Sequence, residues 1–144
     1  MGMGLSIIMG RMVLITGDLA LLHDTNGWLF SKDKNISLIV IMIDNGGGGI
    51  FNQLNIDRIE EGDFEEIFLM PQQVCHLTLA KAYGLKYKQV ACLDDLEKAI
   101  EWSFSLSTNV LIRVCTNSIE DHRLRVNLSD DLKKTLSENL SSFD

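Results

Sequence analysis

The chain has 144 residues, of which 46% are apolar and 23% charged, and its formal net charge at pH 7 is −7. This length and balance fit one soluble domain with a core of its own, and an acidic chain without a basic patch argues against a nucleic-acid partner. The three cysteines show no CxxC or Cys/His metal spacing, so we expect reduced thiols in a cytoplasmic protein. The longest clean apolar run, residues 38–43, is too short to span a membrane.

The first half of the chain predicts a strand, a helix and a second strand. The apolar run 12–16 (MVLIT) is typical of a buried strand, and residues 21–30 predict a short helix. Residues 36–43 (ISLIVIMI) are apolar on both faces, as in a strand inside a parallel sheet that helices cover. Such a β-α-β unit is almost always right-handed. The acidic segment 52–66 is expected to be a loop with a turn of helix.

The second half continues the alternation. Pro71 can begin a helix that runs to residue 83, where Gly84 would stop it. Strands are predicted over 86–91 and 110–114. Between them, a capping box of Asp94 and Glu97 would open a helix whose apolar face carries Leu96, Ala99, Ile100 and Phe104. Ser129 would cap a final amphipathic helix with Leu132, Leu136 and Leu140 on one face. This order predicts an α/β fold over residues 1–144, a single domain whose mainly parallel sheet has helices on both faces.

Polar side chains follow both strands of the first unit. Asp18 comes directly after the first strand, and Asn45 follows the second. If the two strands are neighbours, these side chains face one crevice at the carboxyl ends, where open α/β sheets bind ligands. A carboxylate, an amide oxygen and a glycine carbonyl would form one side of a Mg²⁺ site, with room for phosphate oxygens and water.

Four glycines occupy positions 46–49. They match neither a P-loop, which needs a Gly-Lys-Ser/Thr ending, nor the G-x-G-x-x-G dinucleotide fingerprint. Without side chains, this backbone can wrap a metal ion and approach a diphosphate, and the N–H groups of Leu19 and Ala20 at a helix start could bind phosphate. The residues by themselves leave a plain tight turn open as the alternative.

Gly17-Asp18 followed by Asn45 resembles the thiamine diphosphate motif. The wider stretches GDLALLHDTNGWL, IVIMIDNGGGGIF and FLMPQQV are similar to one branch of that superfamily. That branch is the 2-succinyl-5-enolpyruvyl-6-hydroxy-3-cyclohexene-1-carboxylate synthases of menaquinone and phylloquinone biosynthesis. The resemblance covers most of the chain, and it implies the thiamine diphosphate-binding fold, as the pyrophosphate-binding domain, truncated at its N-terminus.

The resemblance also implies roles for eight residues. They are Asp18, Asn45 and Gly47 as ligands of Mg²⁺ or Mn²⁺, Leu19, Ala20 and Ile50 as further contacts of thiamine diphosphate, and Ile50, Phe51 and Leu54 as the substrate pocket. No catalytic residue is expected in this chain, because the glutamate that activates the cofactor in the family lies in another domain, contributed by a second subunit.

The implied reaction decarboxylates 2-oxoglutarate and adds the resulting carbanion to isochorismate in a 1,4-addition. The family implies a homodimer or homotetramer of chains several times longer, so we expect this chain to be a C-terminal domain that is inactive alone. Two alternatives stay open. One is a domain of another thiamine diphosphate enzyme, of the acetolactate synthase or 2-oxoacid decarboxylase type, and the other is a non-catalytic α/β binding module.

Some polar residues near the motif are ambiguous. Asp44 stands where the family often has asparagine, and its carboxylate would either tighten the metal site or face solvent. His23 lies close to the predicted cofactor end, whereas His76 is expected to pack or to lie on the surface. No role is expected for His122.

Overall fold

The computed structural model of the chain describes residues 10–32, 37–53 and 61–140, so Leu54 of the predicted pocket lies outside the described residues. Within them, four strands form one parallel sheet in the order β1-β2-β4-β3. The strands are β1 (Met12–Gly17), β2 (Leu38–Asp44), β3 (Lys86–Val90) and β4 (Val110–Cys115). The predicted fold class is confirmed, and all four predicted strands are present.

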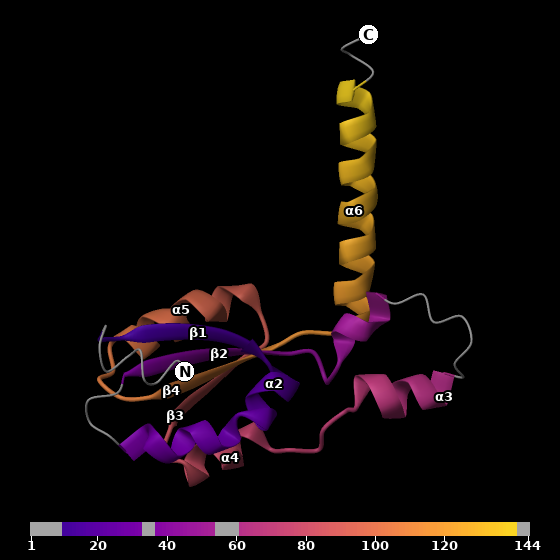
Figure 1. The fold of residues 1–144 in the computed structure, drawn as a ribbon. Helices are drawn as coiled ribbons and strands as arrows, with labels where there is room; N and C mark the ends of the chain where they lie inside the picture. The colour runs from indigo at the N-terminus through magenta and orange to yellow at the C-terminus, as the bar shows by residue number, and fades with distance from the viewer. Residues whose placement is uncertain (1–9, 33–36, 54–60, 141–144) are drawn as a thin grey trace.

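Helices cover both faces of the sheet (Figure 1). Helix α2 (Asp18–His23), the 3-10 helix η1 (Thr25–Lys32) and α4 (His76–Ala82) lie on one face, and α5 (Leu93–Phe104) lies on the other. Short helical segments, η2 (Gly49–Gln53), α3 (Glu61–Phe64) and the π-helical η3 (Glu65–Leu69), follow β2, and α6 (Ser118–Leu140) follows β4. The segment 52–66 therefore contains more helix than the single turn predicted for it.

Strand β2 is buried on both faces, as its sequence predicts. Val40 and Met42 pack toward α2 and α4 and are fully buried, while Ile39 packs into a second apolar cluster beneath α5. Because successive side chains of a strand point to opposite faces, one continuous apolar run supplies both clusters. The strand that ends in Asp44, directly before Asn45, is thus fixed from both sides.

Strand β1, by contrast, is not the buried strand that its sequence predicts. It lies at the edge of the sheet and pairs only with β2 among the described strands. Ile15 is 68% exposed, and Val13 and Leu14 are exposed as well. An apolar run identifies a strand, but it does not say whether the strand lies at the centre or at the edge of its sheet.

Helix α4 begins later than predicted. Residues 71–75 are not helical, and the helix starts at His76, although Pro71 is compatible with a helix start. Gly84, in the left-handed region with φ +73°, directly follows the end of the helix, where a stop was predicted. The missing turn matters for the site, because it places His76 at the first position of the helix beside the end of β2.

Helix α5 lacks the predicted capping box. Its N-cap residue, Cys92, makes no side-chain cap hydrogen bond, so neither Asp94 nor Glu97 acts as expected. The neighbouring Asp95 carboxylate instead accepts hydrogen bonds from Cys92 Sγ at 3.2 Å and Lys98 Nζ at 3.5 Å. Phe104, expected on the apolar face, is 49% exposed.

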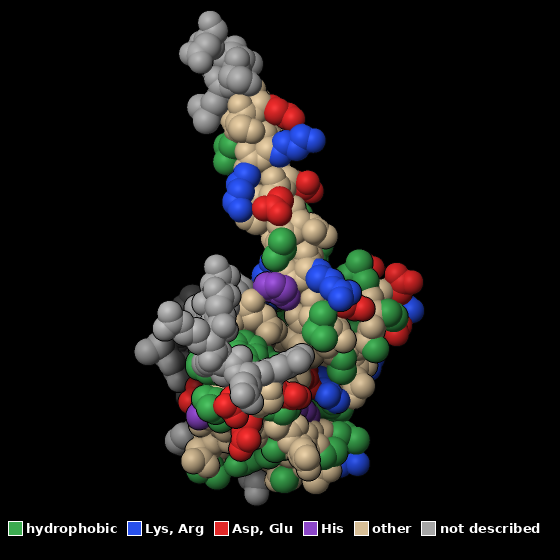
Figure 2. Space-filling model, turned by 90° about the vertical axis from the view of Figure 1, so that its right-hand side faces the viewer, with side chains coloured by type: hydrophobic (Ala, Val, Ile, Leu, Met, Phe, Trp, Pro, Cys, Tyr) green, Lys and Arg blue, Asp and Glu red, His purple; other side chains and the backbone are tan. Residues whose placement is uncertain are grey.

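Helix α6 begins well before Ser129, which lies in its interior. Its cap is Asn117, whose Oδ1 accepts hydrogen bonds from the N–H groups of Ile119 at 3.0 Å and Glu120 at 3.1 Å. The helix projects away from the sheet, and apolar, basic and acidic side chains all lie along its length (Figures 1 and 2). Leu132 and Leu136 are more than 60% exposed, so the final helix packs no apolar face on the sheet.

Two predictions about chemistry and environment can be compared with the described part of the chain. The three cysteines are free and form no disulfide there. None of the described helices combines the length and the apolar character needed to cross a membrane.

Candidate functional site

The ends of β1 and β2 lie side by side. Gly17, the last residue of β1, is level with Ile43 in the parallel register, so Asp18 and Asp44 follow at the same edge of the sheet. Asp18 is the first residue of α2, and Asn45 opens the glycine turn after β2. The juxtaposition expected from the strand pairing is therefore present.

A cavity of about 420 Å³ opens at this edge. It is lined by Gly17, Asp18, Leu19, Ala20, Ile43, Asn45, Gly47, Gly48, Gly49, Ile50, Phe51 and Arg125. The structure thus brings together every predicted cofactor, metal and pocket residue that it describes. Neither His23, which is exposed, nor His122 lines it.

The glycine turn is shaped by close packing against another backbone. Gly47 has φ +134°, and a Cβ there would lie 2.0 Å from the carbonyl oxygen of Leu69. A Cβ on Gly48 would lie 2.1 Å from the carbonyl oxygen of Phe68, and the Gly48 N–H donates a 2.6 Å hydrogen bond to Leu69. The glycines are needed where the turn meets η3, while Gly47 to Gly49 also line the cavity.

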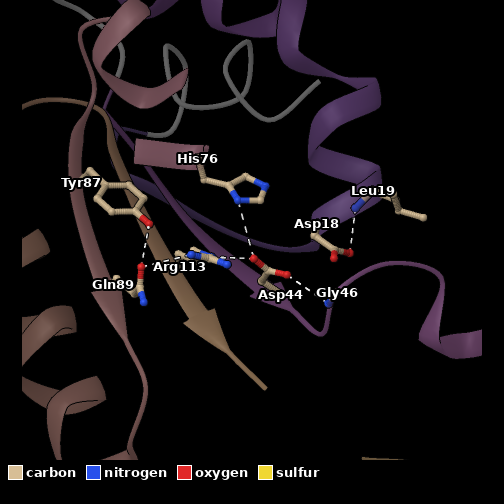
Figure 3. A network of polar contacts seen from close by, with 8 residues as sticks. All are labelled: Asp18, Leu19, Asp44, Gly46, His76, Tyr87, Gln89 and Arg113. Atoms are coloured by element: carbon tan, nitrogen blue, oxygen red, sulfur yellow. Dashed lines mark hydrogen bonds and ion pairs between the residues drawn. The ribbon is translucent and has the colours of Figure 1, made fainter. Parts of the chain in front are cut away.

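Asp44 neither faces solvent nor lines the cavity. Its carboxylate is 7% exposed and accepts a 2.5 Å hydrogen bond from Arg113 Nε and a 3.1 Å bond from the Gly46 N–H (Figure 3). Burial alone would raise the pKa of Asp44, but the contacts with Arg113 and Gly46 outweigh it and place the pKa below its ordinary value. This carboxylate is a charged anchor between β2, β4 and the turn.

His76 completes the group around Asp44. It is 5% exposed, and its Nδ1 lies 3.6 Å from Asp44 Oδ2, too far for a hydrogen bond. Neither ring nitrogen has a hydrogen-bond partner among the described residues. Burial lowers the pKa of His76 despite the nearby carboxylate. Of the two positions expected for His76, packed or on the surface, the structure shows the packed one, next to a charged group.

Asp18 has the opposite electrostatic environment. It is 6% exposed, and its Oδ1 accepts a 2.8 Å hydrogen bond from the Leu19 N–H. No lysine, arginine or histidine forms an ion pair with it in the part of the chain that the structure describes. Its pKa is raised, first by burial and then by the charge of Asp44. A buried carboxylate without a cation is the situation that a bound metal ion would resolve.

The donor chemistry at the cavity fits a hard divalent cation. A carboxylate, an amide and a backbone carbonyl are oxygen donors of the kind that Mg²⁺ and Mn²⁺ prefer. The described residues contain no group of three histidine, cysteine or acidic side chains that could hold a metal by themselves. An ion here would depend on Asn45, on the Gly47 carbonyl and on oxygens of a ligand.

Two arginines of this region were missed in the sequence. Arg113 interrupts the apolar strand VLIRV, and a charge inside such a strand is a signal for a buried partner. Arg125 gives no local signal, because it reaches the cavity only through the placement of α6.

Several known proteins are similar in sequence to this chain. Two 2-succinyl-5-enolpyruvyl-6-hydroxy-3-cyclohexene-1-carboxylate synthases of Prochlorococcus marinus, strains NATL2A and NATL1A, are each 99% identical over all 144 residues. A synthase of the same name from Synechococcus sp. (strain CC9311) is 47% identical over 137 residues. The chain spans 24% of the length of each of these relatives.

Solved structures are similar in fold. The Rhodococcus jostii RHA1 thiamine diphosphate-dependent 4-hydroxybenzoylformate decarboxylase matches 81% of this chain with 22% of its own, at TM-score 0.65 and 22% identity. The benzoylformate decarboxylase of Polynucleobacter necessarius matches 80% of this chain with 21% of its own, at TM-score 0.60 and 21% identity. Residues 1–114 match the family described as thiamine pyrophosphate enzyme, C-terminal TPP binding domain. With this match over most of its length, the chain belongs to the family of C-terminal TPP-binding domains of thiamine pyrophosphate enzymes.

Proposed function

We propose that this chain is the C-terminal, cofactor-binding domain of a 2-succinyl-5-enolpyruvyl-6-hydroxy-3-cyclohexene-1-carboxylate synthase, a transferase that decarboxylates 2-oxoglutarate and adds the carbanion to isochorismate. The observation that carries the proposal is the 99% identity, over every residue of this chain, to two synthases of that name. The complete enzyme would be a cytoplasmic homo-oligomer that makes an intermediate of menaquinone or phylloquinone. Residues 1–144 would form one domain of it.

In this proposal the edge of the sheet holds the metal and the diphosphate. Asp18, the Asn45 side chain and the Gly47 carbonyl would bind Mg²⁺ or Mn²⁺, which would supply the cation that the buried Asp18 carboxylate lacks among the described residues. The N–H groups of Leu19 and Ala20, at the start of α2, would donate to phosphate oxygens. Thiamine diphosphate, when bound, would supply the nucleophilic carbon and store the electrons released by decarboxylation.

Apolar residues after the turn would form the wall on the substrate side. Ile50 and Phe51 line the cavity, and Leu54 is proposed to join them. Ile50 is 65% exposed and Phe51 is 37% exposed, so this chain leaves the wall open on one side. Other parts of the synthase would have to cover it before water is excluded from the reaction, and for this reason we expect the chain alone to be inactive.

Calorimetry with thiamine diphosphate and Mg²⁺ tests the cofactor site in the full-length Prochlorococcus marinus NATL2A synthase. Asp18→Asn should abolish the metal-dependent binding, because the substitution removes the charged ligand. Asp24→Asn is the matched control, since Asp24 is exposed just after α2 and should leave binding unchanged. Equal binding heats for both variants would show that Asp18 does not hold the metal. The absence of any metal-dependent heat in the unsubstituted synthase would favour a module without a cofactor site.

Substrate preference tests the assignment within thiamine diphosphate enzymes. The full-length synthase should release carbon dioxide from 2-oxoglutarate in preference to pyruvate. A preference for pyruvate would instead support the acetolactate synthase or decarboxylase alternative. Product formed by the 144-residue chain alone would contradict the expectation that it is inactive.

A further inference from the structure

The cavity contains one cationic side chain, and it comes from the far end of the sequence. Of the described residues that line it, only Asp18 and Arg125 carry charge, and the others are apolar, glycine or the amide of Asn45. Arg113 lies nearby, but its guanidinium is committed to Asp44 and, through Nη1, to Gln89 at 3.1 Å. Because the chain has a net charge of −7, a cationic side chain that lines this cavity suggests a role in binding an anion.

Arg125 reaches the cavity because α6 packs against the glycine turn. A Cβ built on Gly49 would lie 3.4 Å from Ser118 Cβ, so the first residue of α6 touches the turn. Helix α6 packs on η2, the segment that holds Ile50 and Phe51 (Figure 1). Arg125 lies about two helical turns beyond Ser118 and lines the same cavity as Ile50 and Phe51.

The guanidinium of Arg125 is available for a ligand. Among the described residues it forms no ion pair with any carboxylate, and the side chain is exposed. A guanidinium offers a planar pair of N–H donors that matches a carboxylate in a two-point contact. An anion bound there would lie in a cavity that Arg125 lines together with the apolar Ile50 and Phe51.

We infer that Arg125 is a substrate-binding residue that contacts a carboxylate of an acidic substrate at the mouth of the cavity. The inference rests on the proposed function, which supplies two carboxylate substrates. The other anion of the proposed site would be the cofactor's diphosphate, but Arg125 belongs to α6, which packs on η2, whereas Asp18 begins α2. The substrate carboxylate is therefore the better match.

The test compares Arg125→Gln with Arg123→Gln in the full-length NATL2A synthase. Both arginines are exposed on α6, but Arg123 does not line the cavity, so it is a matched control for charge and helix stability. The Arg125→Gln variant should raise the KM for 2-oxoglutarate or isochorismate about tenfold or more, the loss expected for one charge-assisted contact. Arg125→Lys should recover part of that loss, and Arg123→Gln should leave both KM values unchanged.

A second measurement separates the two anions. Calorimetry with thiamine diphosphate and Mg²⁺ should give the same affinity for wild type and Arg125→Gln. Weaker cofactor binding with unchanged KM values would overturn the inference and assign Arg125 to the diphosphate. Unchanged KM values with unchanged cofactor binding would overturn it as well. Wild-type turnover is measured first, so that a failure of the proposed function itself is recognised before any variant is compared.

Discussion

Two carboxylates of the same type end neighbouring strands, and their environments are opposite. Asp44 is held by Arg113 and the Gly46 N–H, and its pKa is lowered. Asp18, equally buried, receives the Leu19 N–H but no cation among the described residues, and its pKa is raised. A charge that is compensated within the protein has a structural role, whereas one left without a cation is suited to an external one.

The difference shows how a strand end can be both rigid and reactive. Asp44 links β2 to β4 through Arg113 and to the turn through Gly46, so it fixes the backbone from which Asn45 and Gly47 reach the cavity. Asp18, directly after the end of the neighbouring strand β1, lines the cavity itself.

The largest effect is expected at the turn that both carboxylates share. Gly47→Ala would place a Cβ 2.0 Å from the Leu69 carbonyl oxygen at φ +134°, so the backbone must move. We expect the free energy of unfolding to fall by about 3 kcal/mol or more. Urea denaturation measures it, with Gly62→Ala as control because a Cβ there meets no atom within 4 Å. Equal effects of the two substitutions would show that the turn is not closely packed.

The second effect concerns the compensated carboxylate. Arg113→Gln would leave Asp44 buried without its cation, and we expect a loss of about 2 kcal/mol, below the value for a fully buried pair because Arg113 is 30% exposed. Lys98→Gln is the control, since its pair with Asp95 is mostly exposed. In the Arg113→Gln background, Asp44→Asn should restore part of the loss. Two independent, additive losses would mean that the two side chains do not interact.

The sequence was most informative where local chemistry and strand pairing coincide. Apolar runs located three of the four strands, while the strand over 86–91 was predicted from the mixed sequence KYKQVA. The rule that parallel strands end at one edge placed Asp18 and Asn45 together. Helix boundaries were less certain, because a capping pattern at Asp94 or a serine at 129 is one of several ways to start a helix, and the structure uses Asn117 for α6.

The partners of Asp44 could not be read from the sequence. Arg113 lies 69 residues away along the chain, and it reaches Asp44 only because β4 pairs with β2. Arg125 depends on the direction in which α6 leaves the sheet, which no local pattern encodes. The sequence therefore predicted the oxygen donors of the candidate site but not the cations around them.

The third effect has the opposite sign. Asp18→Asn should stabilise the metal-free chain at pH 7 by about 1 kcal/mol, because it removes a buried charge without a cation. Since the folded-state pKa of Asp18 is raised, folding favours its protonated form, and the gain should vanish as the pH falls toward the ordinary value of 3.8. Unfolding with a chelator present, at pH 7 and pH 4, measures both points. A loss of stability at pH 7 would mean that this carboxylate is compensated after all.

The smallest effect is expected at His76. It tests whether Arg113 is the only cation that compensates the charge of Asp44. Because burial lowers the folded-state pKa of His76 below 6.5, the unfolded chain binds the proton more readily. The contribution of His76 to stability should therefore be present above pH 6.5 and decrease as the pH falls below it, by at most about 1.4 kcal/mol per pH unit. His76→Phe should remove this dependence when unfolding is followed from pH 7.5 to 5, whereas substitution of the exposed His23 by Gln should not.

If His76 instead became charged to pair with Asp44, its pKa would be raised and the slope of stability against pH would reverse. Stability that increased on acidification and lost that increase in His76→Phe would show that Asp44 is paired with two cations, Arg113 and a protonated His76, and that its environment differs from that of Asp18 even more than the contacts indicate.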